Sequence, residues 1–210
     1  MTRLEQPFYA RKAQTLAPAL LGKIVVRRLE SAHSENGYVY LSGIIVETEA
    51  YGDVAERDLA CHGDRANGGQ PTPRTQIMFG PAGFAYVYFT YGMHWMFNVV
   101  TGETGRAGAV LLRALQPVMG VEEMRLRRNG RILTELTNGP AKLAQALAID
   151  QSLNGANLCA ADGVIWIEDA PPIPTEHIAV GPRIGLGKTP EPWLSMPWRY
   201  WIKDNSFVSK

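Results

Sequence analysis

Two glutamates at alternate positions, Glu47 and Glu49, followed by Tyr51, are the residues of this sequence best suited to chemistry. They come directly after Ile44-Ile45-Val46, whose β-branched side chains favour a buried strand. Because alternate residues of a strand share a face, two carboxylates and an aromatic ring would point the same way. This arrangement could form the floor of a pocket, where paired carboxylates can hydrolyse a glycosidic bond. The same pattern also fits a solvated edge strand with ordinary surface glutamates.

Arg113 and His62 are two further candidates. Arg113 interrupts the otherwise apolar strand expected at residues 109–115. A buried arginine needs a carboxylate or another acceptor, and the glutamate pair is the obvious one. His62 stands in a long irregular segment, residues 52–76, and loops of this length in a compact domain are usually functional or disordered. Its position after the glutamate strand favours function, although an ordinary loop histidine is the simpler interpretation.

The aromatic segment 83–100 indicates a β-hairpin. Two β-prone runs flank Tyr91-Gly92-Met93, and Gly92 supplies the permissive backbone that a tight turn needs. Tyr91 and Met93 would then lie at the tip, where large apolar residues usually contact something. The alternative is that the tip folds back on the core.

These candidates must be positioned by a mixed set of elements. A helix is expected at residues 15–22, with Pro18 near its start, and two more at residues 120–128 and 139–149. Further strands are expected at residues 23–30, 38–49, 163–168 and 198–202. Together they predict an α+β fold: a single domain, residues 1–210, with a curved, largely antiparallel sheet, short helices and a protruding hairpin.

Length and composition exclude several classes of protein. The chain has 210 residues, of which 46% are hydrophobic and 20% charged, as in a soluble globular domain. No apolar run is long enough to span a bilayer, and the first residues lack the apolar core of a signal peptide. Cys61 and Cys159 form neither a metal-binding spacing nor a disulfide framework. We therefore expect a cytoplasmic protein without a metal, a cofactor or a membrane partner.

The net charge of +1 excludes a protein that is basic overall, but the charge is uneven. A local basic patch can bind phosphates, although a solvated arginine face on a helix is the favoured interpretation. The clustered arginines are Arg125, Arg127, Arg128 and Arg131. The open start of the helix at Asn138-Gly139 could also hold a phosphate on its backbone amides.

Residues 185–189, Gly-Leu-Gly-Lys-Thr, resemble the end of a phosphate-binding P-loop. The full pattern needs a glycine where Pro182 stands, and a helix after the threonine. Pro190 and Pro192 follow instead and would break a helix. We interpret this segment as a glycine-rich turn and reject a nucleotide-hydrolysing function.

Two other function classes stay open on the residues alone. In a glycoside hydrolase, the Glu47/Glu49 pair would act on a sugar oligomer, but such acids must flank the bond, and neighbours on one strand face the same side of it. In a non-catalytic reader of modified bases, the aromatic residues would form a cage without a working base.

The ordered set of motifs resembles the alkyladenine (N-methylpurine) DNA glycosylase family, from about Phe8 to Trp201. The matching pieces are Val46-Glu47-Thr48-Glu49-Ala50-Tyr51, Thr72-Pro73-Arg74, Tyr86-Val87-Tyr88, Tyr91-Gly92-Met93, Asn98, Leu111-Leu112-Arg113-Ala114-Leu115 and Gly139-Pro140-Ala141-Lys142-Leu143. Residues 94–97 and the neighbours of His62 depart from the family.

The resemblance implies a monofunctional base-excision repair enzyme that flips a damaged purine out of duplex DNA and hydrolyses its bond to deoxyribose, leaving an abasic site. The substrates would be 3-methyladenine, 7-methylguanine, hypoxanthine and ethenoadenine. Glu49 matches the general base, and Arg113 the residue that helps to hold the attacking water. We assign Glu47 to structure and expect it to pair with an arginine or to accept backbone amides.

The remaining site residues also come from the resemblance. The base would lie between walls made by Tyr51, His62 and Tyr88. Asn98 matches a gate against the amino group of guanine. Tyr91 matches the wedge that fills the gap in the DNA stack, with Met93 as the next candidate.

The resemblance further implies double-stranded DNA containing damaged purines as the partner, no metal or other cofactor, and no lysine Schiff base. We expect a monomer. Phosphate contacts are expected from Arg74, Arg106 and Lys142.

Overall fold

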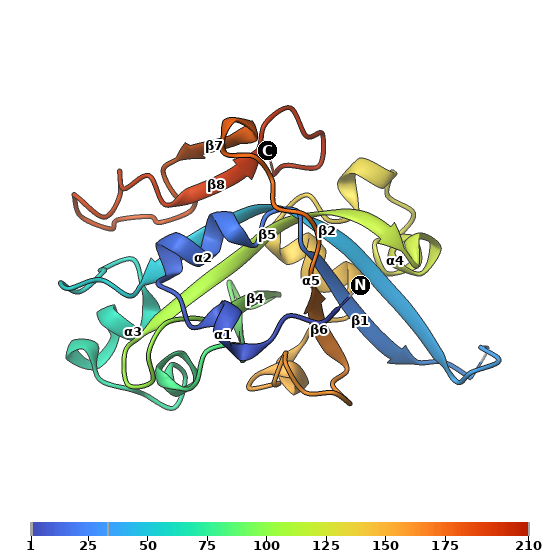
Figure 1. The fold of residues 1–210 in the computed structure, drawn as a ribbon, viewed down its shortest axis with the longest axis horizontal. Coiled ribbons are helices and arrows are strands. Elements are labelled where there is room, and N and C mark those ends of the chain that lie inside the picture. The colour runs from blue at the N-terminus through green and yellow to red at the C-terminus, as the bar shows by residue number, and fades with distance from the viewer. Residues whose placement is uncertain (1, 33, 210) are drawn as a thin grey trace.

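The computed structural model describes residues 2–32 and 34–209, and its centre is one antiparallel sheet of 8 strands (Figure 1). The strands are β1 (Ile24–Glu30), β2 (Tyr38–Gly52), β3 (Ala85–Thr90), β4 (His94–Val100), β5 (Gly108–Met119), β6 (Ile165–Glu168), β7 (Ile178–Gly181) and β8 (Arg199–Ile202). Their order is β3-β4-β5-β2-β1-β6, and β8 pairs with both β2 and β7.

The helices are short and surround this sheet. The α-helices are α1 (Gln6–Tyr9), α2 (Ala13–Ala19), α3 (His62–Arg65), α4 (Val121–Arg127) and α5 (Pro140–Ala146). Single 3-10 turns lie at Ala66–Gly69, Gln76–Phe79, Leu133–Glu135, Gln151–Leu153 and Thr175–His177. The fold class expected from the sequence, α+β with a curved antiparallel sheet, is confirmed.

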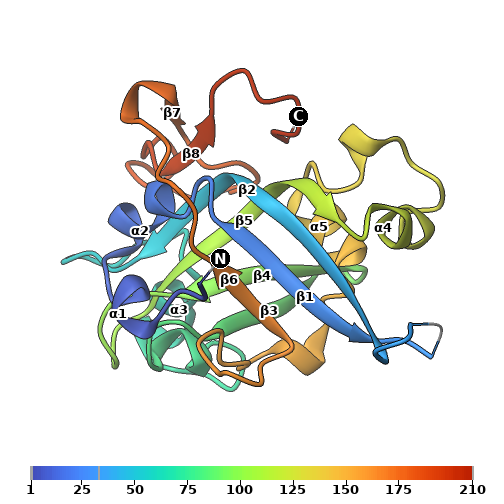
Figure 2. The ribbon, with the colours of Figure 1, turned by 45° about the vertical axis from the view of Figure 1, so that its right-hand side comes forward.

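Strand β2 organises the sheet because it touches three other strands. It pairs with β5 along most of its length, with β1 in its first half, and with β8 at residues 47–49. The β2–β5 register shifts around Glu47, and such irregularities bend a strand and increase its twist. Figure 2 shows the resulting curl of the sheet. The two glutamates therefore lie where β2 is enclosed by a neighbour on each edge.

The main core fills the space between the sheet and helices α2 and α5. Leu16 of α2, Ile45 of β2, Leu112 of β5 and Leu143 of α5 are all fully buried in it. Each such side chain contributes about 1.5–3 kcal/mol through the removal of apolar surface from water. A smaller buried cluster, which includes Tyr86, lies under the site described below. The sheet is thus a rigid support for the polar residues of β2 and β5.

Several predicted boundaries were wrong. The first helix begins at Ala13, so Pro18 lies in its last turn, where it lacks the N–H that would otherwise donate to the backbone oxygen of Gln14. Strand β5 runs on to Met119. The segment that was expected to be irregular contains helix α3, which starts at His62. Strand β7 was not assigned from the sequence.

The arginine cluster lies in and just after helix α4, and its arginines are half-buried except for the exposed Arg131. Three of its guanidinium groups pair with glutamates three or four residues away, at 2.6 to 3.7 Å. Pairs of this kind on an exposed helix contribute only about 0.3–0.5 kcal/mol each. Within the part of the chain that the structure describes, no helix is long and apolar enough to cross a membrane.

Candidate active site

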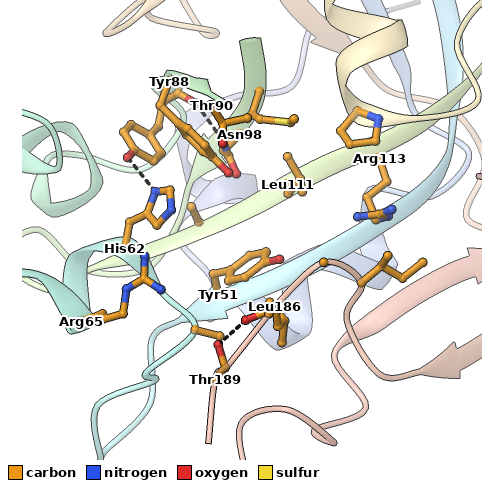
Figure 3. A pocket seen from close by; sticks show the side chains of 18 of the residues that line it. Tyr51, His62, Arg65, Tyr88, Thr90, Asn98, Leu111, Arg113, Leu186 and Thr189 are labelled. Carbon is orange, nitrogen blue, oxygen red and sulfur yellow. Dashed lines mark hydrogen bonds between the residues drawn. The ribbon is translucent and has the colours of Figure 1, made fainter. Parts of the chain in front are cut away.

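A cavity of about 530 Å³ opens where β2 ends, which is a volume suited to a small ligand (Figure 3). Its wall is drawn from β2, α3, the β3–β4 hairpin, β5, the start of α5 and residues 184–189. Six of the predicted site residues line it: Tyr51, His62, Tyr88, Tyr91, Asn98 and Arg113. Segments that are far apart in the sequence therefore meet at one hollow.

Aromatic rings form two opposite sides of this cavity. Tyr51 lies on one side, and His62 and Tyr88 lie on the other (Figure 3). The His62 and Tyr88 rings are in contact, with centroids 4.5 Å apart. A planar ligand that enters between the two sides would stack on both.

His62 is held as a neutral imidazole. Its Nδ1 atom lies 3.2 Å from the Tyr86 hydroxyl, and this contact orients the ring. Burial, together with the positive charges of Arg74 and Arg65, lowers the pKa of His62 from 6.5 to about 4. The His62 ring is therefore uncharged near neutral pH, so it would not itself repel a cationic ligand.

Asn98 has a fixed orientation at the bottom of the cavity. Its Nδ2 donates to the backbone oxygen of Tyr86 at 3.0 Å. The side chain is almost completely buried and comes from β4, opposite Tyr86 in the β3–β4 pair. The hairpin thus supplies a wall residue and a polar group at the bottom from one rigid unit.

Glu49 is fully buried and lies directly behind the wall, because three lining groups contact it, two as hydrogen-bond donors and one as an ion pair. Arg113 Nη1 and the Ile184 amide lie 3.2 and 2.6 Å from Oε1, and the Tyr51 hydroxyl donates to Oε2 at 2.7 Å. Glu49 itself does not border the cavity. Since a carboxylate accepts about four hydrogen bonds, one position on Oε2 stays free.

Opposing electrostatic effects act on the Glu49 carboxyl. Burial raises the pKa of the Glu49 carboxyl, while the Arg113 charge, the Ile184 amide and the Tyr51 hydroxyl counteract this rise. A carboxylate whose pKa lies above its usual range is a better proton acceptor near neutral pH. Burial also raises the pKa of Tyr51 well above its ordinary value, so its hydroxyl stays a donor.

Glu47 has a different environment, although it is equally buried. Its carboxylate accepts from Arg113 Nε at 3.1 Å and from Arg199 Nη1 at 2.9 Å. It also accepts from the backbone N–H and the hydroxyl of Ser209, at 2.8 and 2.9 Å. The predicted pairing of Arg113 with both glutamates is confirmed, and Glu47 pairs with arginines and accepts a backbone amide as expected.

Residues 184–189 are part of the cavity wall, which sequence reasoning missed. The segment had been interpreted only as a glycine-rich turn, and Gly185 and Gly187 do adopt left-handed φ values of 78° and 58°. These conformations allow the chain to approach the site closely. The glycines were a signal of close approach, but nothing local indicated what the segment approaches.

Arg183 anchors that segment and was also missed. Its Nη atoms lie 2.6 and 3.0 Å from the carboxylate of Asp58, and both side chains are completely buried. The Arg183 guanidinium also lies 4.7 Å from the centroid of the Tyr51 ring. This ion pair therefore fixes the wall segment and supports Tyr51 at once.

The hairpin tip projects into solvent rather than folding back on the core. Tyr91 and Met93 have exposed fractions of 78% and 67%. Tyr91 and Gly92 both have positive φ, and the Met93 amide donates to the Thr90 oxygen, as in a type I′ turn. The left-handed conformation of a tyrosine costs about 1–3 kcal/mol, which is usual at functional sites. Tyr91 borders the cavity mouth, whereas Met93 does not.

The basic residues predicted to contact phosphate do not border the cavity. Arg74 lies over the Tyr88 ring at 5.4 Å, Arg106 donates to the Val54 oxygen, and Lys142 donates to Asn138. The basic residues that line the cavity, besides Arg113, are Arg65 and Lys188. Phosphate binding by the first three stays a prediction.

Metal ligands do not gather anywhere in residues 2–32 and 34–209: no group of three or more His, Cys, Asp or Glu side chains could hold an ion. Cys61 and Cys159 are both free thiols. Burial raises the pKa of the Cys61 thiol to about 12, so this neighbour of His62 is not a reactive thiolate.

The chain is similar to known proteins over nearly its whole length. The family model described as "Methylpurine-DNA glycosylase (MPG)" matches residues 7–206. A relative from Carboxydothermus hydrogenoformans, named "Putative 3-methyladenine DNA glycosylase", is 45% identical over 207 residues, covering 99% of this chain and 98% of the relative. Relatives of the same name from Chlorobaculum parvum and Myxococcus xanthus are 44% and 41% identical, covering 100% of this chain and 91% and 95% of their own length.

Proposed function

The chain belongs to the methylpurine-DNA glycosylase family, whose members act on DNA and hydrolyse N-glycosyl bonds, and from that premise we propose its substrates and mechanism. We propose that it excises 3-methyladenine, 7-methylguanine, hypoxanthine and ethenoadenine, as a monomer, with a water activated by Glu49. The observation that carries this proposal is the aromatic cavity with a buried carboxylate, Glu49, held by three groups of its wall.

The cavity is suited to a flipped purine. Tyr51 would stack on one face of the base; on the other face Tyr88 or neutral His62 would stack, and the second ring, at 66° to the first, would contact the base with its edge. A methylated purine that carries positive charge gains about 0.5–2 kcal/mol from each such aromatic face. Asn98, fixed at the bottom, would disfavour the exocyclic amino group of guanine.

The bond to deoxyribose breaks with positive charge developing on the sugar. A methylated purine is already a good leaving group, so the enzyme has to stabilise that charge and deprotonate the attacking water. Glu49 suits both tasks, since Oε2 keeps a free acceptor position and Arg113 opposes protonation of the carboxylate. Positioned proton transfer typically contributes about 10²–10⁴ in rate.

The hairpin tip is placed where it could offset the free-energy cost of base flipping. Removing a base from the stack costs a few kcal/mol, and less at damaged or mismatched pairs. The exposed ring of Tyr91, at the mouth of the cavity, would occupy the gap that the flipped nucleotide leaves. Phosphate contacts by Arg74, Arg106 and Lys142 complete the proposed DNA interface.

The competing functions differ in what they need from Glu47. An inverting glycoside hydrolase would require both glutamates at the bond. The four hydrogen bonds of Glu47 come from Arg113, Arg199 and Ser209, of which only Arg113 borders the cavity. This observation favours a mechanism with one carboxylate.

The test is a duplex that carries one hypoxanthine or one ethenoadenine, incubated with the protein in EDTA. We expect free base and an alkali-sensitive abasic site. Lesion binding without release would indicate a reader instead, and activity that disappears in EDTA and returns with zinc or magnesium would contradict metal-free hydrolysis.

Borohydride gives the matching chemical control, because it traps a Schiff base between a lysine and the sugar. We expect no trapped protein–DNA adduct. A trapped adduct would mean that an amine, rather than water, attacks the sugar.

A further inference from the structure

The C-terminal tail, residues 205–209, returns from β8 to the rear of the candidate active site. Figure 2 shows this segment turning back toward the β2–β5 part of the sheet. Asn205 Nδ2 donates to Gln116 of β5 at 3.1 Å, and the Phe207 and Val208 amides donate to the Asn205 side chain and backbone. The tail is thus a compact turn held on β5, and it delivers Ser209 to a defined place.

Ser209 inserts two donors and one acceptor among the buried charges. Its amide and hydroxyl lie 2.8 and 2.9 Å from the Glu47 carboxylate. Arg113 Nη2 donates to the same hydroxyl at 3.3 Å. The hydroxyl can therefore accept from Arg113 while it donates to Glu47.

All three guanidinium nitrogens of Arg113 consequently have different partners. Nε is held by Glu47, Nη2 by Ser209, and only Nη1 faces Glu49. A planar guanidinium that is fixed at two nitrogens has its third nitrogen fixed as well. The position of Nη1 against Glu49 is thus set by contacts on the side away from the cavity.

We propose that Ser209 is a positioning residue of the active site, which fixes Arg113 against Glu49 through Glu47 and through its own hydroxyl. The inference rests on the proposed role of Glu49 as the general base. It gives the tail a part in the reaction, although no residue of the tail borders the cavity.

The charged and titratable groups that face Glu49 are Arg113 of β5, Glu47 and Tyr51 of β2, and Tyr88 of β3. Among these, Arg113 opposes the effect of burial most strongly, followed by the Ile184 amide. A loosened Arg113 would leave burial less opposed, so the pKa of Glu49 would rise further. The carboxylate would then be protonated at a higher pH, and base release would decline at a higher pH.

The experiment compares pH profiles of single-turnover base release for four variants. Ser209→Pro removes both donors, Ser209→Ala removes only the hydroxyl, and Ser209→Thr keeps both. Ser206→Ala is the matched control, because Ser206 lies exposed on the same tail. Binding of abasic-site DNA and thermal unfolding are measured in parallel.

We expect Ser209→Pro to shift the acid limb of the profile to higher pH, so that base release at pH values below the shifted limb is about tenfold slower than in wild type. Ser209→Ala should show a smaller effect of the same kind. Ser209→Thr should restore the wild-type profile, and binding to abasic-site DNA should not change. The inference would be overturned if the acid limb of Ser209→Pro stayed at its wild-type pH. In that case the loss of base-release rate would be the same at every pH and would follow a lower melting temperature. Wild-type protein that releases no base would instead overturn the proposed function itself.

Discussion

Two carboxylates on one strand, only two residues apart, have opposite surroundings. Glu47 and Glu49 are both fully buried and both contact Arg113. Glu47 faces the tail and Arg199 and accepts four hydrogen bonds, whereas Glu49 lies behind the cavity wall and accepts two, besides its ion pair with Arg113. Burial and an arginine partner therefore do not distinguish the two carboxylates, whereas contact with Tyr51 and residues 184–189 of the cavity wall does.

The structures behind the two carboxylates also differ. On the Glu47 side, the donors come from β5, β8 and the tail, which are held by the sheet. On the Glu49 side, one donor is the Tyr51 ring and another is the backbone of residues 184–189, which also form the wall. The Glu47 side is therefore a fixed support, and the Glu49 side connects the Glu49 carboxylate to whatever occupies the cavity.

Replacing Arg113 with methionine should have the largest effect, because this residue belongs to both environments. Two buried carboxylates would lose a charge partner, and breaking buried pairs destabilises by about 3–5 kcal/mol. Denaturant unfolding measures this loss. The acid limb of base release should also move to higher pH, since Arg113 is the main group that opposes protonation of Glu49.

Arg199→Met is the matched control, since Arg199 contacts Glu47 but not Glu49. It should destabilise the protein less and leave the acid limb where it is. If both variants shifted the limb equally, the two environments would not be separable.

Tyr51→Phe tests the surroundings of Glu49. It keeps the stacking ring but removes the hydroxyl that donates to Glu49 Oε2. A hydrogen bond to a charged group contributes about 1.5–3 kcal/mol. Because that bond favours the carboxylate, its loss should raise the pKa of Glu49 and shift the acid limb of base release to higher pH.

Tyr88→Phe serves as the comparison variant, because it removes a hydroxyl from the opposite wall. Its acid limb should stay in the wild-type position. An unchanged limb in Tyr51→Phe would mean that Glu49 does not titrate in the reaction.

Tyr91→Ala should lower the population of the flipped nucleotide rather than the rate of bond cleavage. Base–aromatic stacking is worth about 1–3 kcal/mol, so the flipped population should fall by about 5- to 150-fold. Single-turnover rates on paired and mismatched lesions measure this. The loss should be smaller opposite a mismatch, where unpairing is partly done. Equal losses on both would assign the wedge to another residue, with Met93 as the next candidate.

The titration of His62 should have the smallest effect on the pH profile of base release. Since its pKa is lowered to about 4, it stays neutral from about pH 5 upward and should add no step to the rate profile there. An NMR titration of the His62 ring would check this directly. Titration near 6.5 would show that the ring is not buried between its neighbours in solution.

Contacts with a local signature were predictable from the sequence. Arg113 interrupts an apolar strand and therefore needed an acid nearby, and it pairs with both glutamates. The aromatic runs around Gly92 indicated a hairpin with an exposed tip, and Tyr91 is exposed. In these cases residue type and spacing carry the physical constraint by themselves.

Contacts made by the backbone or across the whole chain were not predictable. The Ile184 amide binds a carboxylate 135 residues away, and Ser209 reaches one 162 residues away. Every residue except proline has an N–H group, so the sequence does not indicate which amide is used. The Asp58–Arg183 pair likewise depends on the path of a wall segment that only the complete fold defines.

The most direct test places Glu49→Gln and Glu47→Gln side by side on one hypoxanthine duplex, with single-turnover rates corrected for the folded fraction. We expect Glu49→Gln to lose base release by about 10²–10⁴ while it binds abasic-site DNA within about tenfold of wild type. Glu47→Gln should mainly lose stability, and its folded molecules should retain much of the rate. An inactive Glu47→Gln beside a fully active Glu49→Gln would contradict the assignment of the general base.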